Sequence, residues 1–229
     1  MMEIHGVAVS VHTRKVIVAA LEKGLEYRSV PVIPYNPPPG WDGLSPTGRI
    51  PVLRDGDWVL PDSSAICAYL ERRYPAAPLY PSQPREYGNA LWFEQYAGGA
   101  LFREVVHGLF FQKVIRPGML KQETDTAVVR SILDDALPPV FGYLDSALGA
   151  EFLAGSRFSI ADIATVSNLI NFHYLGYSID AVRFPRLAAY FRRQIDRPSI
   201  ARALADEGQV AAAMGLDAGF VHYLGLVPA

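Results

Sequence analysis

Cysteine is almost absent from this chain, which has Cys67 and no other. A single cysteine excludes an internal disulfide framework and any zinc site built from several cysteines. No spacing of histidines or acidic residues resembles a metal-binding motif either. We therefore expect a protein of a reduced, cytoplasmic compartment that binds no metal.

An excess of positive charge and a long apolar run are also missing. The 21 Lys and Arg residues nearly balance the 23 Asp and Glu residues, which leaves a net charge of −2. Such a balance argues against nucleic acid or an anionic membrane surface as a partner. The amino-terminal apolar stretches are short, interrupted by charged residues, and lack the zones of a signal peptide. No segment reaches the roughly 18 apolar residues of a membrane span, so we expect a soluble protein.

The composition is that of a globular protein with a sizeable core. Half of the 229 residues are hydrophobic and 19% are charged. This length allows one large domain or two smaller ones.

Short apolar runs of different period follow one another in the first third of the chain. Residues 2–9 predict a buried strand, residues 12–24 a helix that ends at Gly24, and residues 27–34 a second strand. Strand, helix and strand at this spacing predict a βαβ unit with two parallel strands.

A second group of elements follows residues 35–48, which are rich in proline and glycine and predict a loop or a single helical turn. Residues 50–53 and 58–60 predict two strands joined by a tight turn. Asp62 and the serines after it supply capping side chains for a helix that ends near Tyr74.

The remaining chain predicts helices alone. Residues 76–84 contain three prolines and have the composition of an interdomain linker. Ser159 and Asp162 form a capping box in which Asp replaces the usual Glu or Gln. The helices are expected near residues 85–114, 122–148, 159–175, 185–193 and 199–206.

The peptide bond between Ile50 and Pro51 is a candidate for the cis form, because it begins a strand after a glycine-containing loop. Only about 5–6% of X-Pro bonds are cis, so the trans form is the default. A cis bond would aim the Ile50 carbonyl and amide at a peptide-like ligand.

Asp62 and Ser63 lie at a predicted helix N-terminus, where backbone amides favour negative charge. Ser63 could hold a carboxylate and Asp62 an ammonium group, which together suit an amino-acid head group. A plain helix cap explains the same pair, and from the local pattern alone it is the stronger interpretation.

Ser10 falls between the first strand and the first helix, so its hydroxyl could donate to an anion such as a thiolate. No general base or nucleophile motif surrounds it, and a simple N-cap explains it equally well. His12 is a possible base, although a histidine in a first turn usually faces solvent. Arg14 and Lys15 are expected on the solvated face of the helix.

Three further sets of side chains favour burial over chemistry. Cys67 lies beside apolar positions and is expected to be a buried, inert thiol. His107 and His173 sit among helical apolar residues and are expected to be satisfied core histidines. The aromatics around residues 91–111 are expected mostly in the core, with one helix face available to an apolar pocket.

The order of these elements and motifs resembles a cytosolic glutathione transferase, over nearly the whole chain. The matching stretches are SVHTRKVIVAALEKGLEYRSVPV, LSPTGRIPVLRDGDWVLPDSSAICAYLERRYP and FSIADIATVSNL. The resemblance implies a thioredoxin-like α/β domain at residues 1–78, a linker at 79–86 and an all-α helical domain at 87–229. It also implies a homodimer.

The resemblance assigns roles to the candidate residues. Ser10 matches the active-site serine of phi-like and related bacterial classes, which activates the thiol of glutathione. Pro51 matches the family's cis proline beside Ile50, and Asp62-Ser63 matches the pair that holds the γ-glutamyl end. A small apolar electrophile would lie beside a pocket with these lining residues: Val11, His12, Tyr96, Phe102, His107 and Phe110.

One departure from the family concerns the glycine carboxylate of glutathione. Relatives often hold it with His, Lys or Gln before the cis proline, whereas this chain has Asn36, three prolines and Gly40 there. Trp41 or Arg49 are the candidate substitutes.

Three functions are compatible with these residues and motifs. The first is a glutathione transferase of detoxification, with peroxidase or isomerase activity as further options. The second is a non-catalytic binding protein on the same fold, because a fold does not fix a function. The third, a thiol-disulfide oxidoreductase, would require cysteine at position 10, where this chain has serine.

Overall fold

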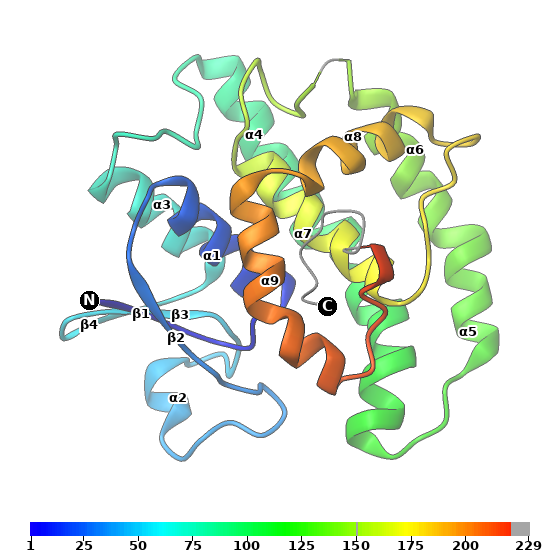
Figure 1. The fold of residues 1–229 in the computed structure, drawn as a ribbon, viewed down its shortest axis with the longest axis horizontal. Helices are drawn as coiled ribbons and strands as arrows, with labels where there is room; N and C mark the ends of the chain where they lie inside the picture. Colours follow the sequence, from blue (N-terminus) through cyan, green and yellow to red (C-terminus); the bar gives the residue numbers. More distant parts are fainter. Residues whose placement is uncertain (150, 221–229) are drawn as a thin grey trace. The chain divides into compact units, whose positions relative to one another are not determined.

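The computed structural model describes residues 1–149 and 151–220, which divide into two compact units (Figure 1). The first unit is Met1–Tyr80, and the second begins at Pro81. Among the described residues, no helix is long and apolar enough to cross a membrane.

The first unit is a mixed four-stranded sheet with three helices. The strands run in the order β2-β1-β3-β4, with β1 parallel to β2 and antiparallel to β3, and β3 antiparallel to β4. This topology confirms the predicted βαβ unit followed by ββα. The elements are β1 (Met2–His5), α1 (Val11–Glu22), β2 (Tyr27–Val30), α2 (Trp41–Leu44), β3 (Val52–Asp55), β4 (Trp58–Pro61) and α3 (Ser63–Arg73).

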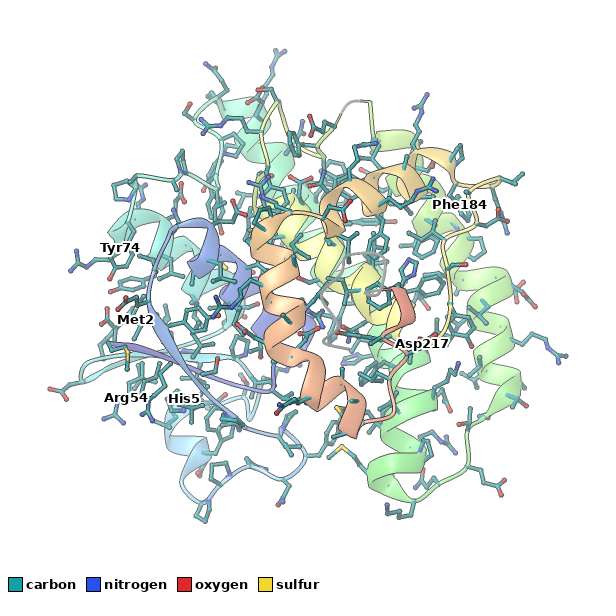
Figure 2. All side chains as sticks on the ribbon, viewed as in Figure 1. Met2, His5, Arg54, Tyr74, Phe184 and Asp217 are labelled. Carbon is teal, nitrogen blue, oxygen red and sulfur yellow. The ribbon has the colours of Figure 1, made fainter. Side chains whose placement is uncertain are left out.

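The two faces of the sheet are covered by different helices. Figure 1 shows α1 and α3 on one face and α2 on the other. Trp41 of α2 packs with Val32 and Val52 in a buried cluster on its own face. The last residue of β1, His5, labelled in Figure 2, lies with its ring 6.4 Å from that of Trp41.

The expectation that Arg14 and Lys15 face solvent is wrong. Arg14 is fully buried, and Lys15 is 4% exposed. A guanidinium N–H of Arg14 donates to the Val9 carbonyl, and Lys15 Nζ donates to Ser64 Oγ at 2.9 Å. Both charged groups have hydrogen-bond acceptors inside the unit, which is the condition for burying them.

The end of the first unit is attached by a partly buried ion pair. Lys23 Nζ lies 2.7 Å from Glu71 Oε2 and also donates to the carbonyls of Tyr74 and Ala77. Glu71 in turn accepts from the amides of Leu79 and Tyr80. These contacts hold the segment after α3 against α1 and α3.

The second unit contains helices joined by loops, and no strand lies among its described residues. Its first helix, α4 (Pro84–Tyr96), continues as the π-helical segments η1 (Ala97–Leu101) and η2 (Arg103–Leu120). The remaining elements are α5 (Thr126–Ser131), η3 (Ile132–Ala136), α6 (Leu137–Ala147), α7 (Ile160–Tyr174), α8 (Pro185–Ile195) and α9 (Pro198–Ala213). The predicted helix at residues 199–206 thus continues to Ala213, because Gly208 does not interrupt an alanine-rich pattern.

Helix α7 is the centre of this unit, with nearly all of its residues buried and with α4, η1, η2 and α8 packed around it. The predicted capping box begins it. The Asp162 carboxylate accepts from the Ser159 amide and hydroxyl, from the Leu153 amide and from the Tyr190 hydroxyl. Burial raises the pKa of this carboxyl, against the opposing effect of the hydrogen bonds.

The two histidines expected in a satisfied core differ from that expectation. His107 is exposed on η2, one turn after Phe102, whose ring it contacts edge-on at 4.6 Å. His173 is half-buried, and its Nε2 has no hydrogen-bond partner among the described residues. Helical spacing places a residue near apolar neighbours but does not decide which face it occupies.

Candidate functional site

The candidate residues of the first unit meet at one end of the sheet. His5, the last residue of β1, is opposite Val52, and Val52 is opposite Pro61 at the end of β4. Ser10 follows β1, Ile50 and Pro51 precede β3, and Asp62 and Ser63 follow β4. Because the strands are paired in this register, these three chain segments lie at the same end of the sheet, which is called its edge below.

The loop after β1 and the residue before Pro51 lie in contact. A Cβ atom added to Gly6 would lie 2.4 Å from Thr13 Oγ1 and 3.4 Å from Ile50 Cβ, so only glycine fits here. The bond between Ile50 and Pro51 is cis, as the resemblance implied.

Ser10 is the N-cap of α1. Its Oγ accepts from the Thr13 amide at 3.5 Å, a long contact, and no described residue accepts its hydroxyl hydrogen. The side chain is partly exposed. Ser10 therefore retains a donor beside the amide groups of a helix N-terminus, where negative charge is favoured.

Asp62 and Ser63 begin α3 in the same way. Asp62 Oδ1 accepts from the amides of Ser64 and Ala65, at 2.9 Å and 3.0 Å. Ser63 is buried, and its Oγ lies 3.4 Å from Nδ1 of His12. The predicted helix cap is confirmed for Asp62, whereas the Ser63 hydroxyl takes no part in capping.

The backbone of Asp62 has an unusual conformation, with φ at 79° and ψ at 124°. A residue with a side chain rarely adopts positive φ, at a cost of about 1–3 kcal/mol, and such residues cluster at ligand sites. The carboxylate of Asp62 is exposed, so capping α3 does not remove it from solvent.

The structure separates the two candidates for a carboxylate at the proline-rich loop. Trp41 is buried, and its Nε1 donates to the Gly48 carbonyl at 3.3 Å, which occupies the only donor of the indole. The suggestion that Trp41 binds a carboxylate is therefore wrong. Arg49 is exposed and lies beside Ile50, and its backbone carbonyl accepts from the Ser45 hydroxyl at 2.7 Å.

The residues expected at an apolar pocket are in both units. In the first unit, Val11 is buried and His12 is partly exposed at the start of α1. In the second unit, Tyr96 lies at the end of α4, its ring 4.7 Å from that of Tyr143, and burial raises its pKa. The other second-unit residues lie further along the same helix: Phe102 and His107 in contact, then the buried Phe110.

One feature of the site was not predicted from the sequence. The N-terminal parts of α1 and α3 are joined by two side-chain hydrogen bonds, one between His12 and Ser63 and one from Lys15 to Ser64. The partners are 51 and 49 residues apart, and no local pattern predicts such pairings. Within residues 1–149 and 151–220, no cluster of His, Cys, Asp and Glu could hold a metal ion.

A mixed four-stranded sheet flanked by helices, followed by a second unit of helices, defines a thioredoxin-like domain joined to an all-helical domain. Family models agree with this architecture. The model "Glutathione S-transferase, N-terminal domain" matches residues 4–78, and "Glutathione S-transferase, C-terminal domain" matches residues 125–193.

Relatives match most of the chain. A glutathione S-transferase of Hyoscyamus muticus is 31% identical, covering 71% of this chain and 78% of the relative. Glutathione S-transferase 1 of Zea mays is 27% identical, covering 89% and 96%. Among solved structures, FzlA from C. crescentus is 26% identical, with a TM-score of 0.83 and coverage of 89% and 92%.

The chain belongs to the cytosolic glutathione S-transferase superfamily, with similarity to plant phi-class and bacterial members. The predicted fold, a thioredoxin-like domain followed by an all-helical domain, is confirmed.

Proposed function

We propose that this protein is a glutathione transferase that binds glutathione at the edge of the first-unit sheet and transfers its sulfur to a small apolar electrophile. The Ser10 hydroxyl donates to the glutathione thiolate. The thiolate attacks an electrophilic carbon, a C–S bond forms, and the leaving group departs with the bonding electron pair.

The effect of Ser10 on the thiol is large enough to matter at neutral pH. A hydrogen bond to a charged group contributes roughly 1.5–3 kcal/mol, and a helix N-terminus adds about 0.3–1 kcal/mol. At about 1.36 kcal/mol per pKa unit, these lower the thiol pKa by about one to three units. A thiol with an ordinary pKa near 8.5 then has a pKa of about 5.5 to 7.5 in the complex, so a substantial fraction of it is ionised at neutral pH.

The remaining groups of the edge bind the rest of the tripeptide. Ser63, through its hydroxyl and its own backbone amide, holds the γ-glutamyl carboxylate, and Asp62 pairs with its ammonium group. The backbone of Ile50, before Pro51, pairs with the cysteinyl part, and Arg49 binds the glycine carboxylate.

Other parts of the proposal rest on family membership. The electrophile is expected to contact Val11 and His12 of the first unit and Tyr96, Phe102, His107 and Phe110 of the second. A homodimer, a cytoplasmic location, a role in detoxification, and peroxidase or isomerase side activity stay predictions of the same kind.

The observation that carries the proposal is the convergence at one sheet edge of Ser10, whose hydroxyl hydrogen has no acceptor among the described residues, with Ile50-Pro51 and Asp62-Ser63. The N-termini of α1 and α3 both favour an anion. The backbone of Ile50, which precedes β3, lies outside the strand pairing and can bond to a peptide. This arrangement suits a peptide with a thiolate in its middle and a zwitterion at one end.

Turnover of an aromatic chloride with glutathione tests the proposal. Ser10→Gly removes the hydroxyl, and glycine at an N-cap costs only a few tenths of a kcal/mol in stability. We expect kcat/KM to fall about 10- to 150-fold in Ser10→Gly, the equivalent of the lost hydrogen bond. Ser10→Thr, which keeps a hydroxyl, should retain more activity. Equal activity in all three proteins would contradict the mechanism.

The second candidate is a non-catalytic binding protein, and the proline-rich loop favours it. Residues 36–40 are exposed and supply no cationic side chain, and Trp41 has no free donor. One relative, 27% identical over 203 residues, is named FtsZ-localized protein A, a name that refers to an association with FtsZ and to no reaction. Calorimetry separates the candidates, because a protein of this second kind shows no heat of binding with millimolar glutathione.

A further inference from the structure

His12, which is expected to line an apolar pocket, also contacts Ser63, a residue proposed to bind glutathione. It is the second residue of α1, and Ser63 is the first residue of α3. His12 Nδ1 lies 3.4 Å from Ser63 Oγ. Both residues belong to the first unit, so their geometry depends on that unit alone.

We propose that His12 is a positioning residue that donates from Nδ1–H to Ser63 Oγ and so directs the Ser63 hydroxyl hydrogen to the γ-glutamyl carboxylate of glutathione. The inference rests on the proposed function and adds a residue to it. In this role His12 acts through Ser63 and makes no contact with glutathione itself.

The chemistry of a hydroxyl explains why the ring matters. A serine hydroxyl has one hydrogen to donate and two lone pairs that accept. If Ser63 donates to an unprotonated Nδ1, its only hydrogen is used and its oxygen turns lone pairs toward the ligand carboxylate, which repels it. If Nδ1 carries a hydrogen, it occupies a lone pair of Ser63, and the hydroxyl hydrogen points away from the ring.

The surroundings of Ser63 are compatible with a hydroxyl that accepts from His12 and donates to the ligand. Ser63 is 6% exposed, so a partner on the protein side limits the rotation of its hydroxyl. Asp62, which precedes it, directs Oδ1 to the amides of Ser64 and Ala65. The 3.4 Å separation is long for a hydrogen bond, and such contacts commonly shorten when a substrate binds.

The second bond between the same helix turns provides a structural comparison. Lys15 Nζ donates to Ser64 Oγ at 2.9 Å and thus connects α1 to α3 without touching the Ser63 hydroxyl. The contact between α1 and α3 therefore does not depend on His12 alone. What His12 adds is control over the Ser63 hydroxyl.

Three variants of His12 test the inference by calorimetry with glutathione. His12→Leu removes the donor. His12→Asn retains an N–H at nearly the position of Nδ1, whereas His12→Gln moves it to the distance of Nε2. We expect a three- to tenfold weaker Kd for His12→Leu and His12→Gln, about the worth of one hydrogen bond, and affinity near wild type for His12→Asn. The inference would be overturned if all three variants bound glutathione as tightly as wild type, or if all three lost the same affinity.

A ligand lacking one carboxylate separates positioning from general damage. The tripeptide 4-aminobutyryl-cysteinyl-glycine differs from glutathione only by the missing γ-glutamyl α-carboxylate. We expect the penalty of His12→Leu to vanish with this analogue, and also to vanish in a Ser63→Ala background. A penalty that persists in both cases would refute an action through Ser63. Failure of wild type to bind glutathione would defeat the proposed function itself, whereas binding that ignores His12 would defeat only this inference.

Discussion

Acid should weaken the second unit through one histidine, His173 on α7. Burial lowers the pKa of His173 from 6.5 to about 4, opposed only in part by the charge of Asp217. The ring stacks on that of Phe191, with centroids 4.2 Å apart and planes 2° from parallel, and lies 5.4 Å from that of Phe220. Apolar neighbours and an Nε2 without a partner among the described residues disfavour the protonated ring.

The sign of the effect follows from the lowered pKa. The unfolded chain takes up a proton near pH 6.5, whereas the folded protein does so only near pH 4. Stability from this group is therefore complete above about pH 6.5 and is lost as the pH falls toward about 4. The full loss is about 3 kcal/mol, of which about 2 kcal/mol is already lost at about pH 5.

Urea unfolding of wild type and His173→Phe at about pH 7.5 and about pH 5 measures this loss. Phenylalanine fills the same stacked position and does not titrate. We expect the two proteins to differ little at the higher pH, and the variant to be more stable by about 2 kcal/mol at the lower one. His107→Gln, at the exposed histidine of η2, should behave as wild type. An equal loss of stability in wild type and His173→Phe would refute the reasoning.

Three further predictions concern single side chains. Lys23→Met should cost about 3 kcal/mol and speed proteolytic cleavage between residues 74 and 80, because Glu71 and two carbonyls lose their partner. Glu26→Gln, at an exposed position nearby, is the control, and unchanged cleavage in Lys23→Met would contradict the prediction. Asp162→Asn should lower the free energy of unfolding in urea by about 3 kcal/mol. The cause is that the amide N–H2 of asparagine would face groups that donate to the carboxylate in wild type. An unchanged free energy of unfolding would show that these hydrogen bonds make no net contribution. Arg49→Gln should weaken glutathione binding about three- to tenfold. The same variant should bind glutathione with an amidated glycine carboxylate as well as wild type does. An equal loss for both ligands would show that Arg49 does not bind the glycine carboxylate.

Much of the fold could be predicted from the sequence because its signals are local. Short apolar runs separated by Gly, Pro and capping residues place the four strands of the first unit and the helices α1 and α3. The capping box at Ser159 and Asp162 forms as expected, since its atoms lie within one helical turn. Capping at Asp62 is local in the same way.

The predictions that failed depend on partners distant in sequence. The charge of Lys15 predicts a place in solvent, but its ammonium group meets Ser64 in another helix. Trp41 lost its expected role because its indole N–H meets the carbonyl of Gly48. A residue type and its local period do not reveal which tertiary partner will satisfy its polar group.

The candidate site lies between these two cases. Its residues could be chosen from the sequence because capping positions and the Ile50-Pro51 bond before β3 have local signatures. Their convergence follows only from the sheet register, which sets His5 opposite Val52 and Val52 opposite Pro61. The contact between His12 and Ser63 is a consequence of that register and has no signature of its own.

The pKa of the thiol of bound glutathione tests the role of Ser10 most directly. The ultraviolet absorbance of the thiolate, followed against pH in the complex, gives this value for wild type and for Ser10→Gly. We predict a thiol pKa about one to three units below the ordinary value in wild type, and a return toward about 8.5 in the variant. The same thiol pKa in both complexes would contradict activation by the Ser10 hydroxyl.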